Sequence, residues 1–111
     1  MTGNEYQNTV LSRFPIPYQN KKDMLRHAVF GLTSEAGEVA GILQKEYQGH
    51  GFDLDHIKRE LGDCLYMIAE ACKALDIKME DIMNINIEKL SKRFPNGFDP
   101  ERSIHRADND I

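Results

Sequence analysis

The sequence predicts an all-α protein built around an antiparallel helical hairpin. Three long segments carry apolar residues at alternating steps of three and four, which is the period of a helix with one apolar face. Aromatic residues make up 8% of the chain and tryptophan is absent, a composition that favours helices. Turn and breaker residues separate the segments at positions 15–17, 49–51, 76–78 and 95–97. We therefore expect helices joined by short connections.

The first long helix is expected from Lys21 to Tyr47, with Asn20 or Asp23 as its N-cap. Its apolar stripe, centred near Ala36, consists of Leu25, Val29, Leu32, Ala36, Val39 and Leu43. A shorter helix through Tyr6, Val10, Leu11 and Phe14 is expected before it.

The second long helix is expected from Leu54 to Leu75, with Asp53 as its N-cap. Its stripe consists of Ile57, Leu61, Cys64, Leu65, Ile68, Cys72 and Leu75. A third helix is expected from Met79 to Phe94, with an apolar side made of Met83, Ile87, Leu90 and Phe94. The stripes of the first two helices are expected to face each other.

The length of 111 residues fits one domain over 1–111, with a helical core at about 20–95 and a polar tail at 98–111. A hairpin and a third helix make only part of a bundle and leave apolar surface over. We therefore expect a homo-oligomer, a homodimer or homotetramer, that completes a four-helix core.

The net charge of −4 gives no reason to expect nucleic acid or an anionic membrane as a partner. No apolar run approaches the roughly 18 residues of a membrane span, and the N-terminus lacks the pattern of a signal peptide. We therefore expect a cytoplasmic protein.

Four carboxylates form two pairs with i, i+3 spacing, Glu35 with Glu38 and Glu60 with Asp63. Such pairs are common by chance in so acidic a chain, but their placement is informative. Both pairs fall off the same side of their apolar stripes, so in an antiparallel hairpin they share one groove. Positions 35 and 63, like 38 and 60, average to 49, within the expected turn at Gly49. All four acids should therefore lie at one level.

Four carboxylates in one groove repel one another and raise each other's pKa values unless a cation is bound. Oxygen-only ligation suits Mg²⁺, with Mn²⁺ as a substitute. The alternative is an ordinary solvated acidic edge of each helix.

On the third helix Asn86, Lys89 and Arg93 form a polar stripe beside the apolar one. Lys89 and Arg93 would neutralise phosphate charge, and the amide of Asn86 would bind a phosphate, a metal or a sugar hydroxyl. The alternative is a solvated helix face. The histidines show no zinc-ligand spacing with the cysteines and are expected in surface or loop positions; they are His27, His50, His56 and His105.

Residues 34–40 (SEAGEVA) and 60–66 (ELGDCLY) resemble the Glu-x-x-Glu and Glu-x-x-Asp motifs of the all-α nucleoside triphosphate pyrophosphohydrolases, in the MazG-like branch. Residues 84–98 are similar to that branch's Asn-x-x-Lys-Leu-x-x-Arg-Tyr/Phe-Pro-x-Gly-Phe ending. Together the matching blocks span residues 34–98.

The resemblance implies Mg²⁺-dependent hydrolysis of nucleoside triphosphates between the α and β phosphates, which releases the monophosphate and pyrophosphate. Its metal ligands carry over onto Glu35, Glu38, Glu60 and Asp63. Glu38, or Glu35, would also orient or deprotonate the attacking water. The substrate contacts carry over onto Asn86, Lys89 and Arg93.

The resemblance leaves the base preference open, because residues 6–18 carry no recognisable base-binding motif. The activity fits a house-cleaning hydrolase that removes non-standard nucleotides. Phosphoribosyl-ATP or another single nucleotide is an alternative substrate. A non-catalytic helical module, whose acidic groove binds a basic partner, is the alternative from another class of protein.

Overall fold

A computed structural model of the chain describes residues 1–105, which form helices and no β-strand. The helices are α1 (Gly3–Arg13), α2 (Lys21–Tyr47), α3 (Leu54–Ala74), α4 (Met79–Arg93) and α5 (Pro100–Ile104). They divide between two compact units, one from Met1 to Met79 and the other from Glu80 onward. The all-α prediction is confirmed, and the bounds of the three long helices agree with the prediction to within one residue.

The starts of α2 and α3 are fixed by hydrogen bonds to N-cap side chains, and both N-cap residues are predicted from the sequence. The side chain of Asn20 accepts hydrogen bonds from the backbone N–H groups of Lys22 and Asp23, so Asn20 is the N-cap of α2. Asp53 accepts one from the N–H of His56 and caps α3 as predicted. These caps supply partners for N–H groups that the first turn of a helix leaves unpaired.

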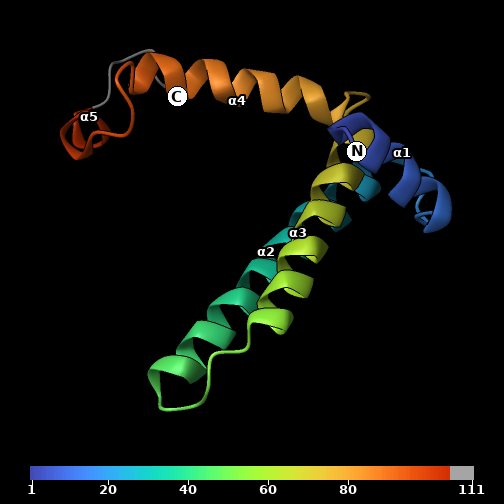
Figure 1. Cartoon of the computed structure of the whole chain (residues 1–111). Coiled ribbons are helices and arrows are strands. Elements are labelled where there is room, and N and C mark those ends of the chain that lie inside the picture. The colour runs from blue at the N-terminus through green and yellow to red at the C-terminus, as the bar shows by residue number, and fades with distance from the viewer. Residues whose placement is uncertain (106–111) are drawn as a thin grey trace. The chain divides into compact units, whose positions relative to one another are not determined.

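Helices α2 and α3 run antiparallel and form the long hairpin of Figure 1. The buried residues of α2 are Met24, Ala28 and Ile42. The expected stripe of α2 is thus wrong in rotation, because its Val29 and Leu43 are about half-exposed. In α3 the expected stripe is right in part: Cys72 is buried, whereas Leu61 and Leu65 keep 50% and 46% of their surface exposed.

The close contact of the hairpin is made at Gly31. A Cβ atom at this position would lie 2.4 Å from Sδ of Met67, so the methionine side chain would have to shift if residue 31 were not glycine. Small residues let two helix backbones approach closely, and Ala28 and Ala69 are both fully buried. The packed face of α2 therefore combines the small residues Ala28 and Gly31 with the larger Met24 and Ile42, and it lies to one side of the expected stripe.

Helix α1 is held against the hairpin through the buried side chain of Gln7. Its amide nitrogen donates to the carbonyl of Ile77 at 3.2 Å, and its oxygen accepts from the N–H of Met79 at 2.8 Å. Just past the C-terminal end of α1 the hydroxyl of Tyr66 donates to the carbonyl of Phe14 at 2.9 Å. The middle of α1 and its C-terminal end are therefore tied to the segment that begins with α3.

The second unit contains nearly all of α4 together with α5. The sequence analysis expected no helix at the position of α5, although Asp99 caps it and Pro100 occupies its first turn, a typical helix start. The expected polar tail thus begins with a short helix, and its residues 106–111 lie outside the described part. Among residues 1–105, no helix has both the length and the apolarity needed to cross a membrane.

Candidate metal centre

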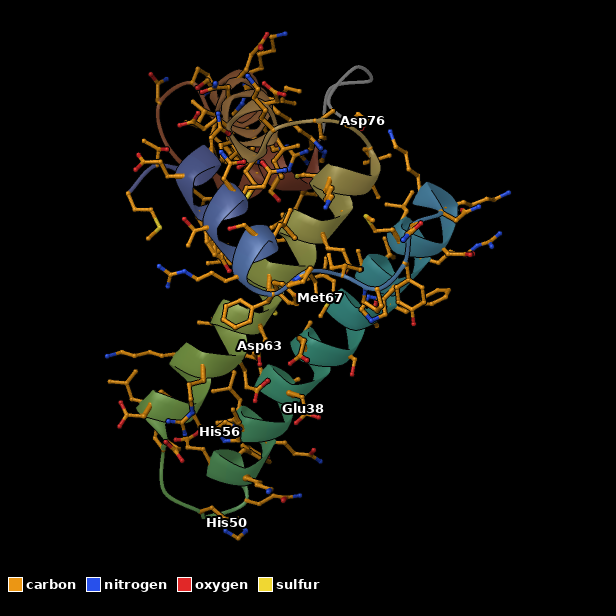
Figure 2. The ribbon with its side chains drawn as sticks, turned by 90° about the vertical axis from the view of Figure 1, so that its right-hand side faces the viewer. Glu38, His50, His56, Asp63, Met67 and Asp76 are labelled. Atoms are coloured by element: carbon orange, nitrogen blue, oxygen red, sulfur yellow. The ribbon has the colours of Figure 1, made fainter. Side chains whose placement is uncertain are left out.

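Three of the four predicted carboxylates meet on the hairpin. One oxygen each of Glu35, Glu60 and Asp63 lies within 4.8 Å of the other two. Glu35 comes from the middle of α2, and the other two come from the first half of α3. We call these three residues the acidic cluster. Figure 2 shows Asp63 in the middle of the hairpin, between Met67 and the turn that carries His50.

The acidic cluster is electrostatically strained. The pKa of Glu35 is raised from 4.5 to about 7, first by a hydrogen bond with Glu60, then by burial and by the negative charges of Asp63, Glu60 and Glu38. Burial, followed by the charges of the three carboxylates of the acidic cluster, raises the pKa of the Cys64 thiol. A proton on Glu35 therefore partly relieves the repulsion when no cation is bound.

The donor atoms of the acidic cluster fit a hard divalent cation. Octahedral Mg²⁺ holds its oxygen ligands at about 2.1 Å, so neighbouring ligands lie about 3.0 Å apart and opposite ligands about 4.2 Å apart. Three oxygens that all lie within 4.8 Å of one another reach such positions with small side-chain adjustments. The cluster contains no thiolate or imidazole ligand, which favours Mg²⁺ or Mn²⁺ over zinc.

Glu38 lies beside the acidic cluster instead of within it. Its charge contributes to the raised pKa of Glu35, while its side chain lines a hollow of about 270 Å³ toward the turn. Lys45, His50 and His56 also line this hollow. Figure 2 shows Glu38, His56 and Asp63 along the same stretch of the hairpin.

The sequence analysis overlooked these basic groups. Nε2 of His56 lies 3.3 Å from a carboxylate oxygen of Glu60, one turn along α3. The hollow therefore places the carboxylate of Glu38 near one lysine and two imidazoles, groups that can donate hydrogen bonds to the phosphates of a ligand. The signal in the sequence was the presence of Lys45, His50 and His56 around the turn between the two acidic pairs.

The three predicted phosphate contacts lie on α4, in the second unit. Asn86 is exposed, whereas Lys89 and Arg93 are partly buried, and their spacing places all three along one side of α4. They stay a prediction as parts of the site.

The sequence analysis also overlooked a pair that joins α2 to α3. Glu70 is 0% exposed, and both of its oxygens contact Nδ1 of His27, at 2.6 and 2.9 Å. His27, expected in a surface or loop position, is 41% exposed, and its Nδ1 is held by a buried carboxylate of α3. The signal was the isolated acid in the sequence Ile-Ala-Glu-Ala-Cys, since burial of a charge requires a partner.

Comparison with known proteins supplies a family for this geometry. The model of the MazG nucleotide pyrophosphohydrolase domain matches residues 24–98, which include all seven predicted site residues. The chain is also similar to the Gene 37 protein of Mycobacterium phage L5, with 28% identity over 78 residues, 66% of this chain and 68% of the phage protein. No solved structure matches.

Proposed function

Because the chain belongs to the MazG nucleotide pyrophosphohydrolase domain family, we propose that it is a Mg²⁺-dependent enzyme that hydrolyses nucleoside triphosphates to monophosphates and pyrophosphate. The observation that carries this proposal is the acidic cluster, in which Glu35, Glu60 and Asp63 converge within 4.8 Å. A bound divalent cation would neutralise phosphate charge and lower the pKa of a bound water.

The residues of the chain divide the remaining work. Glu35, Glu60 and Asp63 would hold the cation, with Glu38 as a fourth ligand or as the base that orients the attacking water. Glu38 suits the second role because its carboxylate stands outside the group of three. Glu35 is the alternative base, since its raised pKa lets it hold a proton near neutral pH.

Basic side chains would hold the phosphates. Lys45 and His56 line the hollow next to Glu38, and Lys89 and Arg93 are proposed to act from α4. Asn86 would contact a phosphate or the sugar. No nucleophilic side chain is needed, because the attacking group is water.

We also propose that the protein works as a homo-oligomer. Val29, Leu43, Leu61 and Leu65 form apolar surface on α2 and α3 that the described chain leaves half-exposed. Covering this surface with a second copy would bury it without blocking the side of α2 that carries Glu38. Analytical ultracentrifugation of the full chain measures the assembly, and a monomer at micromolar concentration would contradict this part of the proposal.

The test of the activity is to incubate the full chain with each common ribo- and deoxynucleoside triphosphate, with Mg²⁺ or with EDTA, in water enriched in ¹⁸O. We expect monophosphate and pyrophosphate, with the heavy oxygen in the monophosphate, only when Mg²⁺ is present. Asp63→Asn and Glu38→Gln should abolish the products. Glu46→Gln is the matched control, because it removes a charge from an exposed part of α2.

Other outcomes would contradict the proposal. Diphosphate and inorganic phosphate would mean that another bond is cleaved. If no nucleotide is cleaved with either Mg²⁺ or Mn²⁺, the acidic cluster serves binding alone, as in a helical module that recognises a basic partner.

A further inference from the structure

A fully buried carboxylate orients one histidine of this chain. Glu70 is 0% exposed, and Nδ1 of His27 lies 2.6 and 2.9 Å from its two oxygens. An ionised carboxylate can only accept hydrogen bonds, so Nδ1 carries the proton and donates it to Glu70. This contact fixes the plane of the imidazole ring and leaves Nε2 without a role in the pair.

The outer edge of the same ring is accessible. The side chain of His27 is 41% exposed and lines an open hollow of about 510 Å³. Tyr18 and Phe30 line this hollow as well, and the rings of Tyr18 and His27 lie 4.9 Å apart at 42°. The hollow thus combines flat aromatic surface with a polar ring of fixed orientation, the two elements that recognise a planar heterocycle.

The hollow begins next to the acidic cluster. Ser34, which lines it, directly precedes Glu35. His27 and Glu35 are eight residues apart on α2, which corresponds to about 12 Å along the helix axis. This separation is comparable to the reach of a nucleotide from its base to its phosphates.

The hollow also stays open when the apolar surface of the hairpin is covered. The packed face of α2 has two flanks. By helical spacing, Leu25 and Leu32 of the apolar stripe lie on one flank, and His27 and Ser34 lie on the other. A second copy that covers the stripe therefore leaves this side of α2 free.

We propose that this hollow is the nucleobase pocket of the enzyme, and that Nε2 of His27 contacts the edge of the base. The proposal rests on the proposed function in one respect, namely that the phosphates of the same nucleotide lie at the acidic cluster. Tyr18 and Phe30 supply the stacking surface. Glu70 is a positioning residue, because it acts only through the orientation of His27.

A second hollow touches the acidic cluster and is the competing location. It measures about 710 Å³ and is lined by Tyr6, Val10, Phe14, Arg59, Gly62, Asp63 and Tyr66. Its aromatic groups also offer stacking, but the Tyr66 hydroxyl is already bound to the carbonyl of Phe14. Each hollow is lined by one arginine, Arg59 here and Arg26 beside His27, but only the hollow at His27 offers a polar ring held in place by a buried carboxylate. The observations therefore favour the hollow at His27.

The experiment measures base discrimination in the full chain. The ratio of kcat/KM between the best and the worst of ATP, CTP, GTP and UTP is compared for wild type, His27→Gln, Glu70→Gln and the control His105→Gln, a histidine exposed in the second unit. We expect the ratio to fall by about tenfold in His27→Gln, since one polar contact with the edge of the base is lost. Glu70→Gln should lower it less, and the control should not change it.

A purely structural role for His27 would lower kcat/KM for all four nucleotides by the same factor, which would overturn the inference. The inference would also be wrong if Phe14→Leu, in the competing hollow, changed the ratio and His27→Gln did not. Melting curves followed by circular dichroism establish that each variant is folded. If His27→Gln does not fold, Glu70→Gln provides the test, because it nearly preserves the shape of the pair of His27 and residue 70.

A second measurement separates this inference from the proposed activity. AMP, CMP, GMP and UMP are added to the wild-type protein in EDTA, and the imidazole signals of the histidines are followed by NMR. Selective shifts of the His27 signals support a base pocket even if no triphosphate is hydrolysed. Hydrolysis together with unmoved His27 signals would leave the proposed activity intact and refute the pocket.

Discussion

The acidic cluster holds three carboxylates against one nearby imidazole, that of His56, whereas the single carboxylate of Glu70 has the imidazole of His27 to itself. Both groups lie on α2 and α3. The carboxylate of Glu70 has its hydrogen-bond partner inside the protein. The carboxylates of the acidic cluster repel one another, and a proton on Glu35 relieves part of this repulsion. We therefore expect Glu70 to stabilise the fold and the acidic cluster to bind a cation.

The largest expected effect comes from a substitution within the acidic cluster. Glu60→Gln should lower kcat by at least about 100-fold, because loss of a group that merely orients a metal ligand already costs about 10–100-fold. Steady-state assays with Mg²⁺ measure this. In EDTA the melting temperature should stay equal or rise, since repulsion within the cluster decreases. A clear drop in EDTA would show that Glu60 supports the fold instead.

The next largest effect tests the other half of the comparison, the pair of His27 and Glu70. Glu70→Leu should lower the free energy of unfolding by about 1–3 kcal/mol, because the N–H of His27 loses its buried acceptor. Urea denaturation followed by circular dichroism measures the change. Glu70→Gln, which still accepts a hydrogen bond, should cost less. Equal stability of wild type and Glu70→Leu would mean that the pair does not stabilise the hairpin.

A pH titration sharpens the comparison. The pKa of Glu35 is raised to about 7 in the folded protein but is near 4.5 when unfolded, so the folded state binds more protons between these values. Stability in EDTA should therefore fall as pH rises from about 4.5 to about 7. Melting temperatures across this range measure it, with Glu35→Gln as the control that should remove the slope. A wild-type stability that rose over this range would contradict the raised pKa.

The smallest expected effect concerns the packing of α2 against α3, the two helices that carry both the acidic cluster and the pair of His27 and Glu70. Gly31→Ala gains helix propensity, but its Cβ would lie 2.4 Å from Sδ of Met67, so we expect a net loss of up to about 2 kcal/mol. Gly37→Ala meets no atom within 4 Å and should gain about 0.5–1 kcal/mol. Thermal melts compare the two variants. Equal stabilisation by both would show that Met67 moves away without cost.

The sequence predicts the helices and the convergence of the acids because both depend on local features. Caps such as Asn20 and Asp53 act within three residues, and a short turn fixes which heights of the hairpin face each other. Glu35, Glu60 and Asp63 were therefore correctly expected to lie together. Glu38 lies along the same stretch of the hairpin, as expected, but its carboxylate stands beside the group of three.

The rotation of the helices could not be predicted from hydrophobicity alone. The face of α2 that is buried carries Met24, Ala28 and Ile42, so it lies to one side of the stripe that the apolar spacing predicts. The pairing of His27 with Glu70 depends on that rotation and joins residues 43 positions apart. Non-local contacts of this kind leave little trace in the sequence.

The attachment of α1 through Gln7 has a consequence for the order of folding. The turn between α2 and α3 closes a short loop, whereas the hydrogen bonds of Gln7 join residues 70 and 72 positions apart and carry a larger loop-closure entropy. The hairpin should therefore form first and gather the repelling acids before α1 docks. Divalent cations present during refolding should consequently accelerate an early step, ahead of the burial of Gln7.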